Sequence, residues 1–199
     1  LSDRLTYLRN LEKRKEEISS SINEQGKMTE ELAAAINSAE TLVEVEDIYR
    51  PYKPKRKTRG SVAREKGLEP LAEIILAQNT ATVPEKEAEA FVDAEKGVNS
   101  ADEAIAGAMD IIAEDLSDNA ELRKKLREEI FAVGIISSSA SSDEADEVYK
   151  NYFEYSEPVG KIAGHRVLAL DRGEKEGALK VSISLSEGIG EKMCVKELV

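Results

Sequence analysis

The chain has 199 residues, of which 41% are hydrophobic and 34% charged, and its formal net charge at pH 7 is −12. This length suffices for one ordinary domain or two small ones, and the composition excludes both a membrane protein and a disordered chain. The apolar stretches are too short for a transmembrane span or a signal peptide, and a single cysteine is typical of a reducing cytosol. We therefore expect a cytoplasmic protein with no membrane contact.

The first fifty residues predict three helices joined by short connections. Residues 2–24 place leucine and isoleucine side chains at helical spacing, and residues 29–38 form a second, shorter amphipathic segment. Thr41 and Glu44 have the spacing of a capping box, which predicts a third helix that ends before Pro51. The predicted stripe of the first helix comprises Leu5, Leu8, Leu11, Ile18 and Ile22.

A basic segment, residues 50–66, follows these helices. It carries a charge of +7, which leaves −19 on the rest of the chain. Pro51 and Pro54 disfavour a regular helix, so we expect an extended loop followed by a short helical turn over residues 61–66. Its basic residues are Arg50, Lys53, Lys55, Arg56, Lys57, Arg59, Arg64 and Lys66.

Residues 70–134 predict further helices. Pro70 and Pro84 occupy first-turn positions of two of them, and Ser100 with Glu103 forms a capping box for a longer third. Asn119 caps the next helix, which Gly134 ends. The side chains expected to face inward on that helix are Leu122, Leu126, Ile130 and Phe131.

The last third of the chain changes character. Residues 137–142 include five serines and are expected to form a polar connector, and residues 148–153 favour a helix. Residues 165–176 fit a helix or a strand. Residues 179–185 alternate apolar and polar side chains, which predicts the one convincing strand. Its partner is either residues 134–138 or a sheet edge in a missing domain.

Residues that could support catalysis are few. His165 is the only histidine, which excludes a multi-histidine metal site, and Cys194 has no second cysteine beside it. Gly188 and Gly190 lack the strand, loop and helix context of a phosphate-binding loop. We expect no enzyme activity, no cofactor, no metal and no small-molecule substrate.

The basic segment allows two interpretations. Its cations could neutralise nucleic-acid phosphates, with Tyr49 and Tyr52 available for base stacking. Alternatively, they could pair with the acidic helices of the same molecule and hold the segment against the scaffold.

Two stretches around this segment closely resemble the N-terminal region of the bacterial Tex family of RNA-binding transcription accessory proteins. They are Asp47-Ile-Tyr-Arg-Pro-Tyr-Lys-Pro-Lys-Arg-Lys-Thr-Arg59 and Ala63-Arg-Glu-Lys-Gly-Leu-Glu-Pro-Leu-Ala72. Shorter matches are Leu8-Arg-Asn-Leu-Glu-Lys-Arg14, Gln25-Gly-Lys27, Tyr152-Phe-Glu-Tyr-Ser-Glu-Pro158 and His165-Arg-Val-Leu-Ala-Leu-Asp-Arg-Gly-Glu-Lys-Glu-Gly177. The resemblance runs over nearly the whole chain.

The resemblance implies a parent protein with a helical N-terminal region, a ribonuclease-H-like YqgF domain, helix-hairpin-helix elements and a C-terminal OB-fold that binds RNA. This chain matches the first part only, and its start at Leu1 also leads us to expect a fragment. The resemblance favours a helix over residues 165–176.

We therefore expect a mainly α-helical fold with one short β element near the C-terminus. Residues 1–134 are predicted to form a helical N-terminal region, and residues 135–199 a connector that leads toward a missing YqgF-like domain. The expected function is that of a non-catalytic scaffold that associates with nucleic acid, RNA or single-stranded DNA, through the phosphate backbone, with transcription machinery as a possible partner. The residues expected to bind are Lys53, Lys55, Arg56, Lys57, Arg59 and Arg64. The alternative is a structural or protein-interaction module whose basic segment packs on its own acidic surface.

Overall fold

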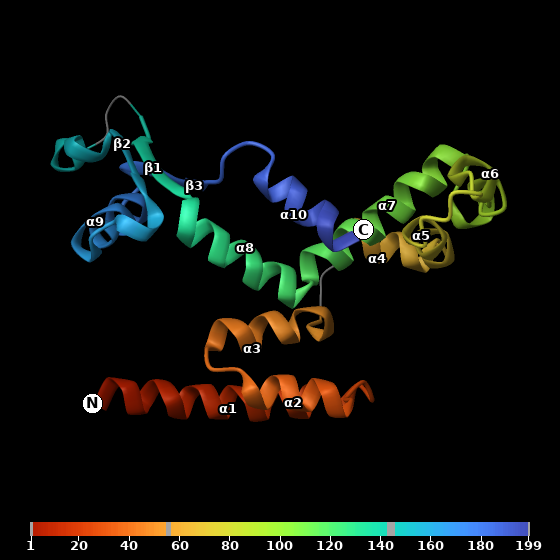
Figure 1. Cartoon of the computed structure of the whole chain (residues 1–199), viewed down its shortest axis with the longest axis horizontal. Helices are drawn as coiled ribbons and strands as arrows, with labels where there is room; N and C mark the ends of the chain where they lie inside the picture. Colours follow the sequence, from red (N-terminus) through yellow and green to blue (C-terminus); the bar gives the residue numbers. More distant parts are fainter. Residues whose placement is uncertain (1, 55–56, 143–145, 199) are drawn as a thin grey trace. The chain divides into compact units, whose positions relative to one another are not determined.

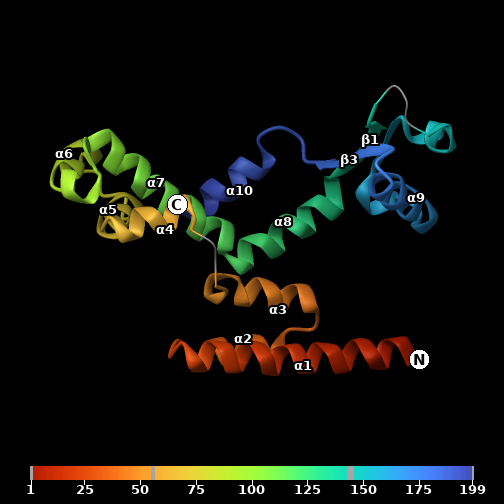
Figure 2. The same cartoon turned by 180° about the vertical axis from the view of Figure 1, so that it is seen from behind.

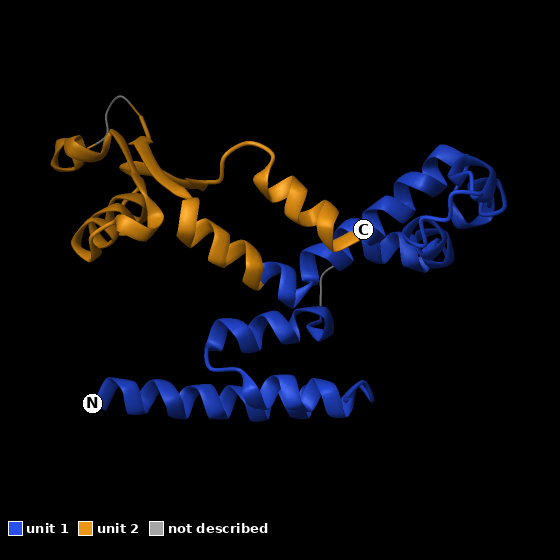
Figure 3. Cartoon of the chain, viewed as in Figure 1, with its two compact units in different colours: residues 1–123 blue, residues 124–199 orange. Residues whose placement is uncertain are grey.

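The computed structural model describes residues 2–54, 57–142 and 146–198. These residues divide into two compact units, Leu1–Arg123 and Lys124–Val199 (Figure 3). The division falls within a helix that runs from Ala120 to Val133. The domain boundary expected at the end of that helix remains a prediction.

The first unit begins with the three predicted helices, which lie together in Figure 1. They are α1 (Ser2–Glu24), α2 (Glu30–Ser38) and α3 (Leu42–Tyr49). The predicted capping box is confirmed, because Thr41 accepts a hydrogen bond from the Glu44 amide and the Glu44 carboxylate accepts one from the Thr41 amide. These bonds satisfy amides that a helix start otherwise leaves without partners.

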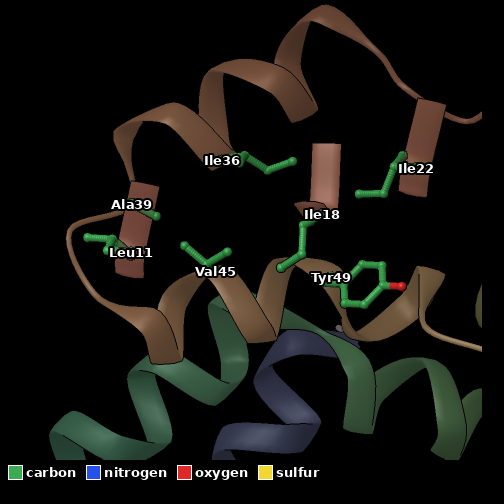
Figure 4. Close-up of a cluster of buried hydrophobic side chains, with 7 residues drawn as sticks. All are labelled: Leu11, Ile18, Ile22, Ile36, Ala39, Val45 and Tyr49. Carbon is green, nitrogen blue, oxygen red and sulfur yellow. The ribbon is translucent and has the colours of Figure 1, made fainter. Parts of the chain in front are cut away.

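Side chains from all three helices form one hydrophobic cluster (Figure 4). Leu5 and Leu8, which were predicted on the buried stripe, are instead exposed. The reason is length, because α1 has 23 residues whereas α2 and α3 have 9 and 8 and cannot cover all of it. The buried members of the cluster are Leu11, Ile18, Ile22, Ile36, Ala39, Val45 and Tyr49.

The rest of the first unit is built around the long helix α7. Alanines on its inner face, Ala104 and Ala108, are fully buried and allow neighbouring helices to approach closely. Asn119 accepts a hydrogen bond from the Leu122 amide, as its predicted capping role requires. The elements are the 3-10 turn η1 (Arg50–Tyr52), α4 (Arg59–Glu65), α5 (Glu69–Leu76), α6 (Pro84–Glu89), the 3-10 turn η2 (Ala94–Lys96) and α7 (Ala101–Asp118). Helices α4, α5 and α6 all pack against α7 (Figure 2).

The second unit contains a three-stranded antiparallel sheet in the order β2-β1-β3. Ile136 on the central strand lies opposite Ile183 of β3 and Glu157 of β2. Ile136 also joins the buried cluster formed with Tyr149, Leu170 and Leu179. The elements are α8 (Ala120–Val133), β1 (Ile135–Ala140), η3 (Glu147–Tyr152), β2 (Glu154–Pro158), η4 (Val159–Lys161), α9 (Gly164–Lys175), β3 (Leu179–Ser184) and α10 (Ile189–Leu198).

The mainly α-helical fold is confirmed, and the predicted strand is β3. Its partner is the segment 135–140, so the serine-rich stretch expected to be a connector supplies most of the central strand. Serine fits there because Ser138 donates to the Tyr152 carbonyl (2.6 Å) and Ser137 hydrogen-bonds Ser182 (3.0 Å). The helix expected over 148–153 is a 3-10 turn that leads into β2, a strand the pattern did not indicate.

Phe131 was expected to face inward on α8, and this was wrong, since it is 65% exposed. It lies nine residues after the buried Leu122, about two and a half turns of helix, and therefore on the opposite face. Among the described residues, no helix combines the length and apolarity that a bilayer crossing requires.

Candidate nucleic-acid interface

Local hydrogen bonding places the basic segment directly against α7. Thr58 and Ser61 form a capping box, with the Ser61 amide donating to Thr58 Oγ1 (3.0 Å) and the Thr58 amide donating to Ser61 Oγ (2.9 Å). Helix α4 consequently begins at Arg59, two residues earlier than the sequence indicated. A methyl group at Gly60 would overlap the Glu114 side chain and crowd the Asp110 carbonyl, so glycine is what allows α4 to lie this close to α7.

Four carboxylates of α7 face the basic segment, and we refer to them as the α7 carboxylate row. Asp110, Glu114 and Asp118 are spaced one turn apart, which places them on one face of the helix, and Asp115 lies beside Glu114. The side chains of Asp118 and Glu114 are largely buried, whereas Asp110 and Asp115 are more accessible. The row is thus a line of fixed negative charge beneath the cations.

Ion pairs connect the arginines of the segment to this row. Arg50 Nε lies 2.9 Å from an Asp118 carboxylate oxygen, and Arg59 Nε lies 3.3 Å from an oxygen of Asp110. Arg64 is held most firmly, because its guanidinium contacts Glu114 (3.3 Å), Asp115 and Glu69 (3.2 Å).

The lysines pair outside the row. Lys53 Nζ lies 4.0 Å from Glu46, Lys57 Nζ lies 3.0 Å from Glu65, and Lys66 donates to the Gly97 carbonyl (2.7 Å). Each basic residue of the segment that the structure describes therefore has an intramolecular partner. Lys55 and Arg56, which were also expected to bind, lie outside the described residues.

Exposure divides these cations into two groups. The side chains of Arg59, Lys57 and Lys53 are 88%, 67% and 59% exposed. Arg64 is 30% exposed, and although burial lowers its pKa, the Coulombic attraction and hydrogen bond of Asp115, with help from Glu69, raise that pKa above the ordinary arginine value. Arg64 is thus built into the packing of α4 on α7, while the other three side chains are largely in solvent.

Two open grooves flank Arg59. One has a volume of about 490 Å³ and is lined by Arg50, Lys53 and α7. The other, of about 560 Å³, is lined by Lys57, Lys66 and apolar residues of α4. Arg59, Thr58 and Asp110 line both grooves, so Arg59 and its acidic partner stand at the point the grooves share.

The aromatic part of the prediction was wrong for Tyr49. Tyr49 is 8% exposed in the hydrophobic cluster of the first three helices, and its hydroxyl hydrogen-bonds Ser21 (3.0 Å). Arg14 covers the ring face, with its guanidinium carbon 5.7 Å from the ring centre. Tyr52 also packs partly against this cluster. Tyr49 lies four residues after Val45, and this helical spacing would have predicted that Tyr49 is buried. The interpretation of Tyr49 as a stacking residue relied instead on the basic residues that follow it.

The sequence reasoning also missed a second link near the segment. Arg123 Nε lies 2.6 Å from a carboxylate oxygen of Asp47, and Asp47 is 5% exposed. Together with the Arg50 and Asp118 pair, this contact ties α3 and η1 to the end of α7 and the start of α8. The partners are 76 and 68 residues apart in the chain, so no local pattern indicates them.

The other candidate chemical groups named from the sequence, His165 and Cys194, belong to the second unit. His165 is exposed in the first turn of α9, and Cys194 is a partly buried free thiol on α10. The described residues contain no group of three or more histidine, cysteine, aspartate or glutamate side chains that could hold a metal ion.

The architecture defines a helical module that carries a basic segment over an acidic helix, and comparison with known proteins assigns it to a family. A model of the Tex central region-like family matches residues 79–197. The chain belongs to this family.

Named relatives extend the match toward the N-terminus. The protein YdcI of Bacillus subtilis (strain 168) is 48% identical over 191 residues, which cover 92% of this chain and 26% of YdcI. The transcriptional accessory protein Tex of Neisseria gonorrhoeae is 37% identical over 185 residues, covering 92% of this chain and 24% of that protein. The human S1 RNA-binding domain-containing protein 1 is 26% identical over 187 residues, covering 87% of this chain and 18% of that protein. The chain thus spans about a quarter or less of the length of these relatives.

Proposed function

We propose that this chain is a non-catalytic scaffold within a Tex-like transcription accessory protein and that it contacts the phosphate backbone of single-stranded nucleic acid, RNA above all. The names of two relatives support a role in transcription and RNA binding, since one is called a transcriptional accessory protein and the other an S1 RNA-binding domain-containing protein. The proposal includes a cytoplasmic location, for which the single cysteine is the support.

The observation that carries the proposal is the exposure of Lys53, Lys57 and Arg59. Among the described residues each makes a single ion pair with its own side chain exposed, and such pairs contribute about 0–1 kcal/mol each. A phosphate can therefore replace the carboxylate at little cost, with release of counterions as the driving force. Contacts of this kind position a strand without reading its bases.

Arg50 and Arg64 support the scaffold part of the proposal. Their partners Asp118 and Glu114 are largely buried, so exchanging them for phosphate would leave charge in a poorly solvated place. We therefore assign Arg64 to holding α4 on α7 and leave nucleic-acid contact to the three exposed cations. This observation also favours a second candidate function, a structural or protein-interaction module in which the whole segment serves the scaffold.

In the longer protein, we propose that residues 1–134 form the helical N-terminal region and that residues 135–199 lead toward a YqgF-like domain. This placement rests on the resemblance of residues 47–72 to the N-terminal region of the Tex family. Single-stranded DNA and proteins of the transcription machinery are further proposed partners of the longer protein.

A salt titration with matched charge reversals tests the proposal. Binding of a labelled 12-nucleotide oligouridylate is measured at about 50 and 200 mM salt for the wild-type chain and for the triple variant Lys53→Glu, Lys57→Glu and Arg59→Glu. Because each phosphate contact on a single strand contributes roughly 0.7 to the salt slope, we expect the triple variant to lose about 2 from that slope and at least tenfold in affinity.

The matched control is the triple variant Lys27→Glu, Lys86→Glu and Lys161→Glu, which makes the same change in net charge at exposed positions elsewhere. It should retain most of the affinity. Equal losses in both triple variants, or no binding by the wild-type chain at about 50 mM salt, would refute the proposed contact and leave the scaffold function standing.

A further inference from the structure

Asp110 has a place in the α7 carboxylate row that its neighbours do not share. It lines both grooves that flank Arg59, and one of its carboxylate oxygens lies 3.3 Å from Arg59 Nε. Glu114 and Asp118, in contrast, are largely buried against Arg64 and Arg50 and each lines only one groove. Asp115 also contacts Arg64, so Asp110 is the member of the row that lies where the two grooves meet and pairs with Arg59.

We propose that Asp110 is an internal competitor for phosphate and that it lowers the affinity of the basic segment for nucleic acid. The inference rests on the proposed function, because it concerns the same cations. A carboxylate and a phosphate are both attracted to a guanidinium, so the ion pair with Asp110 weakens the attraction of Arg59 for a phosphate. The Arg59 and Asp110 pair is thus an autoinhibitory contact built into the fold.

Two physical effects contribute to this competition. The carboxylate is tethered on a rigid helix beside its partner, so its effective concentration at Arg59 is high although the single pair is weak. A phosphate that enters either groove also meets the negative charge of Asp110 within the screening length at physiological salt. Affinity therefore depends on whether Asp110 holds Arg59 or releases it.

The variant Asp110→Asn tests the proposal because it removes the charge and preserves the shape of the side chain. We expect it to bind the labelled oligouridylate about three- to tenfold more tightly than the wild-type chain at about 50 mM salt, with a smaller gain at 200 mM. The control is Asp102→Asn, the same chemical change at an exposed position in the first turn of α7, which should change affinity by less than about twofold. Thermal melting of both variants establishes that the fold is retained.

A double-mutant cycle separates release of Arg59 from a general loss of negative charge. In an Arg59→Ala background, Asp110→Asn should give a clearly smaller gain, because the cation it would release is gone and only the repulsion of phosphate by the Asp110 charge remains. A gain of the same size in that background, or affinity of Asp110→Asn equal to that of the wild-type chain, overturns the inference. The proposed function fails on a different result, namely that reversal of Lys53, Lys57 and Arg59 has no specific effect on wild-type binding.

Discussion

Arg59 and Arg64 lie on the same short helix, five residues apart, yet their side chains have different surroundings. Arg59 extends into solvent and touches one carboxylate, whereas Arg64 is surrounded by Glu69, Glu114 and Asp115. Five residues are more than one full turn of an α-helix, so the two side chains leave α4 in different directions. That of Arg64 lies between α4 and α7. The contribution of an arginine to stability thus depends on its position around α4.

At this scale we predict that Arg64→Met lowers the free energy of unfolding by about 1–3 kcal/mol, since it removes the cation that three carboxylates surround. Arg59→Met should change it by less than about 0.5 kcal/mol, because its only described ion pair is exposed. Urea unfolding followed by circular dichroism measures both. Equal effects of the two substitutions would contradict the assignment of Arg64 to the scaffold.

At the scale of single elements, helix α9 shows how one small residue allows close packing. Gly173 lies on the buried side of α9, where an added methyl group would come 2.6 Å from Leu179 and 2.9 Å from Tyr149. Both neighbours belong to the hydrophobic cluster of the second unit. The absence of a side chain at Gly173 is what allows α9 to pack against the start of β3 and η3.

We predict that Gly173→Ala destabilises the chain by about 1–3 kcal/mol, because overpacking forces neighbouring side chains to move. Gly164→Ala on the same helix is the matched control. Nothing lies within 4 Å of a methyl group there, so its effect should stay within about 0.5 kcal/mol. Thermal melting of the two variants decides the matter, and a Gly173→Ala variant as stable as the wild-type chain would show that the packing can relax.

At the scale of the whole chain, carboxylates whose pKa is lowered occur in both units. Hydrogen bonds from Asn99 lower the pKa of Glu103 in the first unit. In the second, Tyr149 and then Arg172 lower the pKa of Glu176 through hydrogen bonds, and Tyr155 and then Arg166 do the same for Glu157. Folding therefore favours the ionised form of all three groups.

The sign of the resulting pH dependence follows from these shifts. A carboxylate whose pKa is lower in the folded state stabilises the fold above its unfolded value, here 4.5, and that contribution is lost as the pH falls through the folded pKa. We predict that the melting temperature declines as the pH is lowered from about 5 to about 3 at constant ionic strength. A melting temperature that is constant over this range would contradict the prediction.

The same arrangement sets an alkaline limit for the second unit. The hydrogen bond to Glu176 raises the pKa of Tyr149, and burial followed by the bond to Glu157 raises the pKa of Tyr155, both above the ordinary value of 10.0. A raised pKa contributes stability that is complete below the unfolded value and lost as the pH rises through the folded one. Neutral pH lies between the acid and alkaline limits.

Several features of this molecule could be predicted because their causes are local. The capping box at Thr41 and the strand period of residues 179–185 depend on neighbours a few residues away, and both were recognised. At Ser100 the predicted box is half formed, because the Glu103 carboxylate accepts from the Asn99 amide and not from that of Ser100. Phe131 and the β2 strand were missed for the opposite reason. The exposure of Phe131 depends on which face of α8 is covered, and the pairing of β2 depends on a central strand about twenty residues earlier, which composition suggested was a loop.

By itself, the sequence determined that the protein is mainly helical, that residues 50–66 form a positively charged segment, and that its motifs resemble those of the Tex family. These properties follow from helical periodicity, composition and sequence motifs, which depend only on the order of residues in the chain. Only the tertiary structure decided which cations face solvent and which are clamped by the α7 carboxylate row. That distinction arises because folding brings side chains about fifty to seventy residues apart into contact, and burial rather than charge then determines what each can bind.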